Sequence, residues 1–261
     1  HEARLRQAIE SHCGIPVVGA IPRAEMLSIP DRHLGLIPRE ENDALLPVIA
    51  ACKQTVEQHL DLRTVLEIAR AAPPLLQPEQ PHNPAPEKQA LPVRIGIFRD
   101  RAFTFYYPDN LAALEEAGAE LVFMDSLNDP MLPDVDALYI GGGFPEIFME
   151  ELSANAQLRT AIHQAVEQNL PVYAECGGLM YLSQRIRWGD RSAEMVGVLP
   201  CEIEMTGKPQ GHGYVIAEVE TENPFFPPGS VLRGHEFHNS RLHAVSGDPN
   251  QDCLPTCYRL A

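Results

Sequence analysis

The chain has 261 residues, enough for one large domain or two modest ones. Its 44% hydrophobic and 21% charged residues are typical of a folded globular protein and argue against global disorder. With 20 basic against 36 acidic residues, a net charge of −16 and no basic stripe, the composition argues against nucleic-acid binding. No apolar run approaches the roughly 18 residues of a membrane span, and the opening HEARLRQAIE, a polar and helix-like segment, does not resemble a signal peptide. We therefore expect a cytoplasmic protein with no membrane partner.

A proline-rich stretch divides the chain. Residues 71–92 contain seven prolines and predict an extended linker, because proline fixes φ and removes backbone donors. Residues 1–70 before it predict a helix, a β-like run at 15–21 and a long helix at 43–70 that Asp43 caps. One strand cannot build an independent core, so we interpret 1–70 as the end of a larger domain and 93–261 as a separate domain.

Residues 93–174 alternate between strand and helix patterns. Strands are predicted at 93–98, 119–124, 137–140 and 171–174, with helices at 109–118 and 157–169 between them. This alternation predicts an α/β fold with a mainly parallel sheet. Functional residues in such folds lie at the C-terminal ends of the strands.

Two of those strand ends carry unusual residues. Gly141, Gly142 and Gly143 follow one strand, and such a run can turn backbone N–H groups toward a ligand, although a simple tight turn is the alternative. Cys176 follows another strand and begins the next helix, as a nucleophile does in a strand–turn–helix elbow. This elbow needs small neighbours, which Ala174 and Gly178 provide.

The elbow predicts a reactive thiol. A cysteine at a helix N-terminus is expected to favour the thiolate, the form that attacks a carboxamide. The N–H of Gly177 and an N–H near Gly143 would then stabilise the oxyanion. The alternative is that Cys176 is a small buried side chain without chemistry.

The other cysteines predict no further site. All six cysteines lack a repeating spacing, which fits reduced thiols better than a disulfide framework. Cys253 and Cys257 form the one close pair, but no second pair completes a tetrahedral zinc site. No metal site is predicted.

Five motifs together resemble the cobyrinate a,c-diamide synthase family, over residues 93–260. They are RDRAFTFYYPDNL (99–111), LYIGGGFPE (138–146), AECGGLMYL (174–182), EMVGVLP (194–200) and GHEFHNS (234–240). The resemblance implies a flavodoxin-like class I glutamine amidotransferase domain, preceded by a partial α/β synthetase segment. It also implies a reaction in which the synthetase activates carboxylates of a tetrapyrrole-derived ring with ATP and Mg²⁺. The glutaminase domain, which binds no cofactor itself, would hydrolyse glutamine and supply the ammonia.

The chain departs from that family in two places. It has no Gly-x-x-x-x-Gly-Lys-Ser/Thr phosphate loop, which predicts a fragment that lacks most of the ATP site. The family's late Tyr-x-His-x-His-like segment, which supplies the histidine paired with cysteine, has no match before Ala261.

Other residues must then supply the remaining chemistry. His238 and His235 are the candidates for a general base, with a structural or substrate-contacting role as the alternative. We interpret His212 as a turn residue, and Glu146 and Glu175 as polar contacts of the site.

Several alternatives stay open. The ring can be cobyrinate, sirohaem or nickel sirohydrochlorin, and Asn239, where the family more often has tyrosine, leaves that choice undecided. The aromatic run at 103–107 can face the ring or belong to the core. A non-catalytic binding module, a stand-alone cysteine hydrolase and a homodimer are also compatible with the sequence.

Overall fold

The computed structural model describes residues 1–29, 31–32, 35–36, 45–75, 92–223, 225–245 and 258–260. The chain divides into two compact units, His1–Asn83 and Pro84–Ala261. In the described residues no helix is both long and apolar enough to cross a membrane.

The first unit is mainly helical. It contains α1 (Glu2–Cys13), η1 (Glu25–Leu27), the paired short strands β1 (Asp31–Arg32) and β2 (Gly35–Leu36), α2 (Leu45–His59) and α3 (Leu62–Ala71). The three α-helices contain no buried residue, so their apolar faces are not enclosed within this unit.

Two predictions for this unit are wrong. The predicted single helix at 43–70 is two helices: α2 ends at His59, and Asp61 caps α3, its side chain accepting from the Thr64 N–H at 3.1 Å. The predicted β-like run at 15–21 forms only one isolated bridge, between Gly19 and Leu60. Asp43 lies outside the described residues.

The second unit is built on a parallel sheet in the order β5-β3-β6-β8. Its strands are β3 (Arg94–Phe98), β5 (Glu120–Met124), β6 (Ala137–Ile140) and β8 (Val172–Ala174), and each neighbouring pair is parallel. The helices α4 (Pro108–Glu116), α5 (Met149–Ala154), α6 (Ala156–Glu167) and α7 (Gly177–Leu182) connect or follow these strands. The predicted α/β fold with a mainly parallel sheet is therefore confirmed, with strand ends within two residues of those expected.

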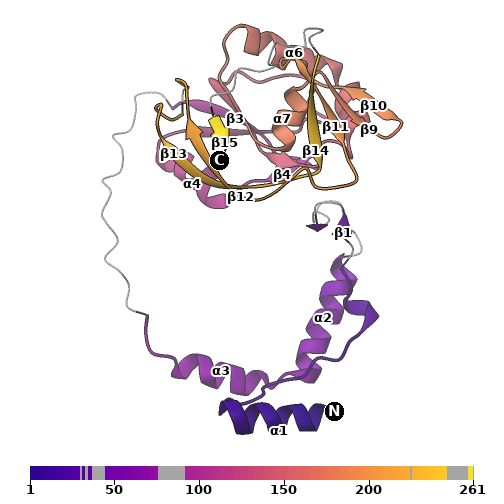
Figure 1. Ribbon diagram of the computed structural model, residues 1–261, viewed down its shortest axis with the longest axis vertical. Helices are drawn as coiled ribbons and strands as arrows, with labels where there is room; N and C mark the ends of the chain where they lie inside the picture. Colours follow the sequence, from indigo (N-terminus) through magenta and orange to yellow (C-terminus); the bar gives the residue numbers. More distant parts are fainter. Residues whose placement is uncertain are drawn as a thin grey trace. The chain divides into compact units, whose positions relative to one another are not determined.

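Two further sheets, antiparallel except where β9 and β11 pair in parallel, lie after Leu182, where the sequence patterns predict no elements. One sheet has the order β10-β9-β11-β14, from β9 (Arg185–Trp188), β10 (Arg191–Glu194), β11 (Cys201–Met205) and β14 (Ser240–Ala244). The other has the order β13-β12-β15, from β12 (Gly211–Val219), β13 (Val231–His238) and β15 (Tyr258–Leu260). In Figure 1, the two sheets are drawn on either side of α7.

The aromatic run at 103–107 is divided between the core and the surface. Phe103 is fully buried and packs against Phe98 and Tyr181, with ring centroids 6.0 and 5.5 Å away. Phe105 and Tyr107 are exposed. The same run contains β4 (Phe103–Phe105), which pairs with β7 (Gly142–Gly143), so it supports the glycine segment next to the predicted nucleophile.

Candidate active site

Cys176 lies at a sharp turn between a strand and a helix. β8 ends at Ala174, α7 begins at Gly177, and Cys176 between them has φ 48° and ψ −107°. A non-glycine residue with positive φ in this region is strained by roughly 1–3 kcal/mol and persists only where its surroundings hold it. The predicted elbow is present.

Glycines next to Cys176 allow the chain segments to approach closely. A Cβ atom on Gly178 would stand 2.2 Å from the carbonyl oxygen of Ile140, and one on Gly143 would stand 2.0 Å from that of Ala102. Any larger residue would collide with backbone, which cannot move as a flexible side chain does. The small residue predicted at position 178 is therefore required by packing.

Two backbone N–H groups lie next to the thiol. Those of Gly177 and Gly143 are close enough to the Cys176 sulfur to lower the pKa of its thiol. An oxyanion formed on a carbon bonded to that sulfur would lie beside the same donors, and fixed donors of this kind stabilise developing negative charge. The structure brings together the cysteine and the two glycines that the sequence predicts for the oxyanion site.

Tyr106 supports the glycine segment, a role that the sequence patterns do not reveal. Its hydroxyl accepts from the Gly141 N–H at 2.9 Å and donates to the carbonyl of Phe98. Burial raises the pKa of Tyr106, so the phenol keeps the proton that it donates. The hydroxyl joins the end of β3 to the start of the segment that carries Gly143.

The predicted preference of Cys176 for the thiolate is wrong. Burial among protein atoms raises the pKa of the Cys176 thiol although its edge reaches solvent, and the carboxylates of Glu146 and Glu175 raise it further. The N–H groups of Gly177 and Gly143 act in the opposite direction and do not overcome these effects. The thiol therefore needs a base, or a change on substrate binding, to become a nucleophile at neutral pH.

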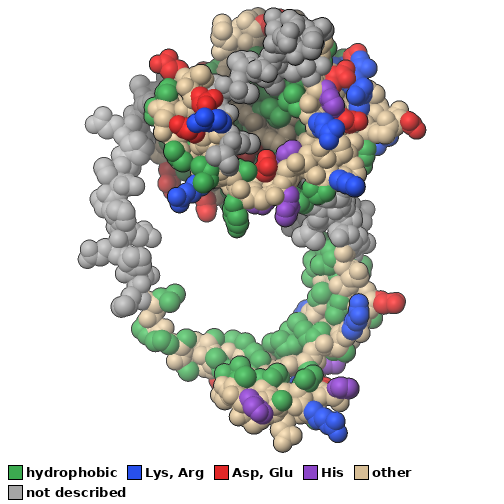
Figure 2. Space-filling model, viewed as in Figure 1, with side chains coloured by type: hydrophobic (Ala, Val, Ile, Leu, Met, Phe, Trp, Pro, Cys, Tyr) green, Lys and Arg blue, Asp and Glu red, His purple; other side chains and the backbone are tan. Residues whose placement is uncertain are grey.

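His238 and His235 lie in the same pocket as Cys176. This pocket has a volume of about 570 Å³, and Glu175 contributes to its wall. Other lining residues include Leu179, Met180, Ile203, Glu236, Phe237, Ser240 and Leu242. Figure 2 shows histidine, acidic and hydrophobic side chains close together around a hollow in the larger unit.

The hydrogen bonds of His238 suit it to act as a base. Its Nδ1 lies 2.9 Å from the carbonyl oxygen of Ser240, which can only accept, so Nδ1 carries the proton. Nε2 of the neutral ring then has a free lone pair, and the Glu236 carboxylate 3.8 Å away would stabilise the protonated ring. The ring packs over Gly211, where a Cβ atom would stand 2.5 Å from Nε2.

The structure also describes Glu146 and His212, two of the other residues singled out in the sequence. Glu146 is buried and acts on the Cys176 thiol through its charge. His212 was expected in a turn but lies in β12, where it faces Phe237 across the strand pair. Cys253 and Cys257 lie outside the described residues.

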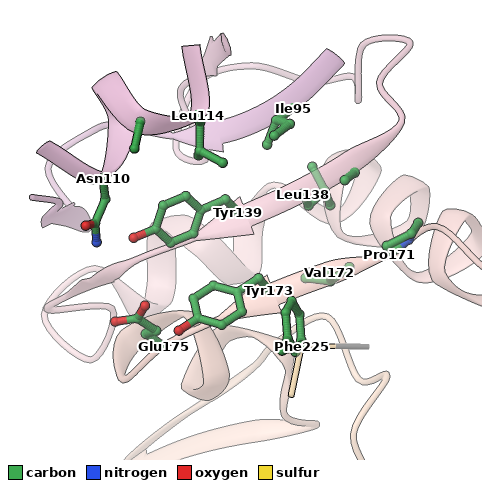
Figure 3. A pocket seen from close by; sticks show the side chains of 12 residues that line it. Ile95, Asn110, Leu114, Leu138, Tyr139, Pro171, Val172, Tyr173, Glu175 and Phe225 are labelled. Carbon is green, nitrogen blue, oxygen red and sulfur yellow. The ribbon is translucent and has the colours of Figure 1, made fainter. Parts of the chain in front are cut away.

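A second pocket adjoins the first at Glu175, which lines both. It has a volume of about 500 Å³ and lies over β6 and β8, with apolar side chains in most of its wall (Figure 3). Tyr139, Tyr173 and Phe225 form edge-to-face contacts across it, with ring centroids 5.5 and 5.1 Å apart. It contains no histidine or cysteine, so the chemistry belongs to the Cys176 pocket.

The residues that the structure describes offer no magnesium site. They contain no group of three or more histidine, cysteine, aspartate or glutamate side chains that could hold a metal ion. The sequence also lacks a phosphate-binding loop. The donors present here do not fit ATP with Mg²⁺.

Comparison with known proteins places this geometry among glutamine amidotransferases. Residues 94–253 match the CobB/CobQ-like glutamine amidotransferase domain. A cobyrinate a,c-diamide synthase of Magnetococcus marinus is 46% identical over 244 residues, which are 92% of this chain and 52% of that protein. The synthase of the same name from Methanothermobacter thermautotrophicus is 41% identical over 247 residues, covering 95% of this chain and 54% of that protein.

The chain thus spans about half the length of the curated relatives it matches. Among solved structures, a glutamine amidotransferase from Thermotoga maritima is 16% identical with a TM-score of 0.40, covering 58% of this chain and 63% of that one.

Proposed function

Because this chain belongs to the family of CobB/CobQ-like glutamine amidotransferase domains, we propose that it hydrolyses glutamine at Cys176 and supplies ammonia to an amide-forming synthase. The observation that carries the proposal is the strained elbow at Cys176, with the backbone N–H groups of Gly177 and Gly143 beside its sulfur. Strained nucleophile turns with paired donors are typical of enzymes that attack carbonyl groups.

The first half of the reaction forms a thioester. His238 Nε2 takes the proton of Cys176, and the sulfur attacks the side-chain carboxamide carbon of glutamine. The electron pair of the C=O bond moves to oxygen, which the two N–H groups stabilise. The C–N bond then breaks as the nitrogen takes the proton back from His238 and leaves as ammonia.

The second half releases glutamate. Water loses a proton to His238 and attacks the thioester carbon, and the C–S bond breaks as the sulfur regains a proton. His238 is thus base and acid in turn, a role that its free Nε2 and the Ser240 contact support. Its place in the pocket of Cys176 supports the assignment.

We assign the ammonia acceptor from the relatives' names. The proposed acceptors are the a and c acetate groups of cobyrinate, as in cobalamin biosynthesis, with sirohaem and nickel sirohydrochlorin as the alternatives. ATP and Mg²⁺ would activate these groups in the part of the enzyme that matches the other half of the relatives' length. The enzyme would act in the cytoplasm, where ATP is available.

A non-catalytic binding module is the competing hypothesis. The raised pKa of Cys176 favours it, because a protonated thiol is a weak nucleophile. The two hypotheses differ in whether glutamine-dependent amidation requires the thiol of Cys176.

Replacing Cys176 by Ala in the full-length enzyme tests the proposal. Glutamine-dependent amidation is expected to fall by about 10⁴-fold or more, because the covalent route is lost. Amidation with ammonium chloride should continue at the rate of the unsubstituted enzyme, since ammonia bypasses the glutaminase site. Rates with cobyrinate, sirohaem and nickel sirohydrochlorin would identify the ring, and Cys201→Ala is the control. An equal loss with both nitrogen donors, or no loss with glutamine, would contradict the proposal.

A further inference from the structure

The β12–β13 strand pair has an unusual outward face. Alternate residues of paired strands point to the same side of a sheet, and the register places three cross-strand pairs together on one side. These residues, called the β12–β13 face below, are His212 with Phe237, Tyr214 with His235, and Ile216 with Arg233.

This face is exposed although most of its side chains are apolar or aromatic. Tyr214 is 95% exposed, Ile216 46% and Phe237 40%. The outward face of an antiparallel strand pair is normally polar, and exposed apolar clusters mark binding surfaces. Hydrophobic and histidine side chains gather at the surface in Figure 2 where Figure 1 places β12.

The rings of this face form a continuous series. The centroid of His212 lies 5.4 Å from that of Phe237 and 6.5 Å from that of His235, and His235 lies 5.7 Å from Tyr214. All three contacts are edge-to-face, and aromatic side chains of this kind offer large contact area to a conjugated ligand.

The charge of the face is opposite to that of the chain. The three pairs contain Arg233 and two histidines but no carboxylate, in a chain with a net charge of −16. Glu218, the next outward residue of β12, is bound by Arg259 at 2.6 Å. The face therefore favours anions over cations.

The face continues into the active site. His235 and Phe237 belong to it and also line the Cys176 pocket. A ligand on this face would lie next to the place where ammonia is released.

We propose that the β12–β13 face binds the acceptor of the synthase, a conjugated macrocycle with carboxylates at its edge. This inference rests on the proposed function. The aromatic rings and Ile216 would contact one face of the macrocycle, while Arg233 and the histidines pair with its carboxylates. A protein surface could also cover apolar residues, but a face with Arg233, two histidines and no carboxylate fits a polycarboxylate ligand.

Steady-state kinetics of the full-length enzyme test this inference, with ammonium chloride as the nitrogen donor and the most rapidly amidated of the three rings as acceptor. Tyr214→Ala and Arg233→Gln are expected to raise the KM for the ring about tenfold each, the effect of losing one charged or well-packed contact. Tyr107→Ala and Arg187→Gln, exposed residues away from the face, are the matched controls and should stay within about twofold. Thermal unfolding of each variant checks the fold.

The outcomes separate three explanations. A KM for the ring that stays within about twofold in both face variants overturns the inference. So does a loss confined to the glutamine-driven reaction, which would make the face a contact between parts of the enzyme. An enzyme that amidates none of the three rings with ammonia contradicts the proposed function, before any face variant is compared.

Discussion

The two halves of the larger unit contribute to the site in different ways. Residues 94–182 hold the parallel sheet and supply Cys176 together with backbone N–H groups, whose positions follow from close contacts between glycines and neighbouring carbonyls. Residues 185–244 are mainly antiparallel strands and supply side chains, His238 and His235 among them. The first half therefore positions the N–H groups that would stabilise the oxyanion, and the second supplies the side chains that would exchange protons with the thiol and the substrate. Changes in the first should act on folding and catalysis together, and changes in the second on catalysis alone.

The largest effect is expected for Gly178→Ala. The added methyl group would stand 2.2 Å from the Ile140 carbonyl oxygen, so β6 or α7 must shift. We expect the free energy of unfolding to fall by about 3 kcal/mol, measured by urea denaturation, with loss of glutaminase activity.

Gly207→Ala is the matched control, because its Cβ atom would meet nothing within 4 Å. It should change the free energy of unfolding by no more than about 0.5 kcal/mol. Equal stability of the two variants would show that the contact at Gly178 does not constrain the elbow.

His238→Gln is expected to act on catalysis without unfolding the protein. Glutamine can keep the hydrogen bond to the Ser240 carbonyl but cannot exchange a proton at neutral pH. The kcat for glutamine hydrolysis should fall about 100-fold, the usual contribution of a general base. His235→Gln, in the same pocket but on the outward face, should cost less than about threefold. A larger loss at His235 would move the base to that residue.

A smaller effect is expected on the pH dependence of Cys176. Because burial, Glu146 and Glu175 raise the pKa of the thiol, its alkylation by iodoacetamide should accelerate at a higher pH than that of a cysteine in a short peptide. Glu146→Gln removes one negative charge, so the midpoint should move to lower pH. A midpoint at or below that of the peptide would show that the helix end and the N–H groups outweigh burial.

The sequence predicts the first half of this unit better than the second, for a physical reason. A parallel sheet buried on both faces produces apolar strands separated by helices, and an elbow requires glycine, so both leave a local pattern. The strands after Leu182 are harder to predict: β11 alternates apolar and charged residues, but β12 and β13 mix glycine, histidine and exposed apolar residues, which leaves no regular alternation. Likewise, the role of Tyr106 depends on Gly141, 35 residues away in the chain.

The raised pKa of Cys176 is not predictable from the sequence, for a related reason. The position at a helix N-terminus is visible in the sequence, but the burial that chiefly raises the pKa of the thiol is not, and Glu146, whose carboxylate raises it further, lies in the turn after β7. α7 has only six residues, which limits its dipole. The nearby histidine, His238, reaches the pocket through long-range strand pairing.

Labelling by a glutamine analogue that carries an electrophilic diazoketone tests the central claim most directly. Mass spectrometry of the 261-residue chain should find one label, on Cys176, and an excess of glutamine should prevent it. Cys13, Cys52 and Cys201 are the internal controls and should stay unlabelled. Label on one of these cysteines instead of Cys176, or label on Cys176 that glutamine does not prevent, would contradict a glutamine-hydrolysing site at this elbow.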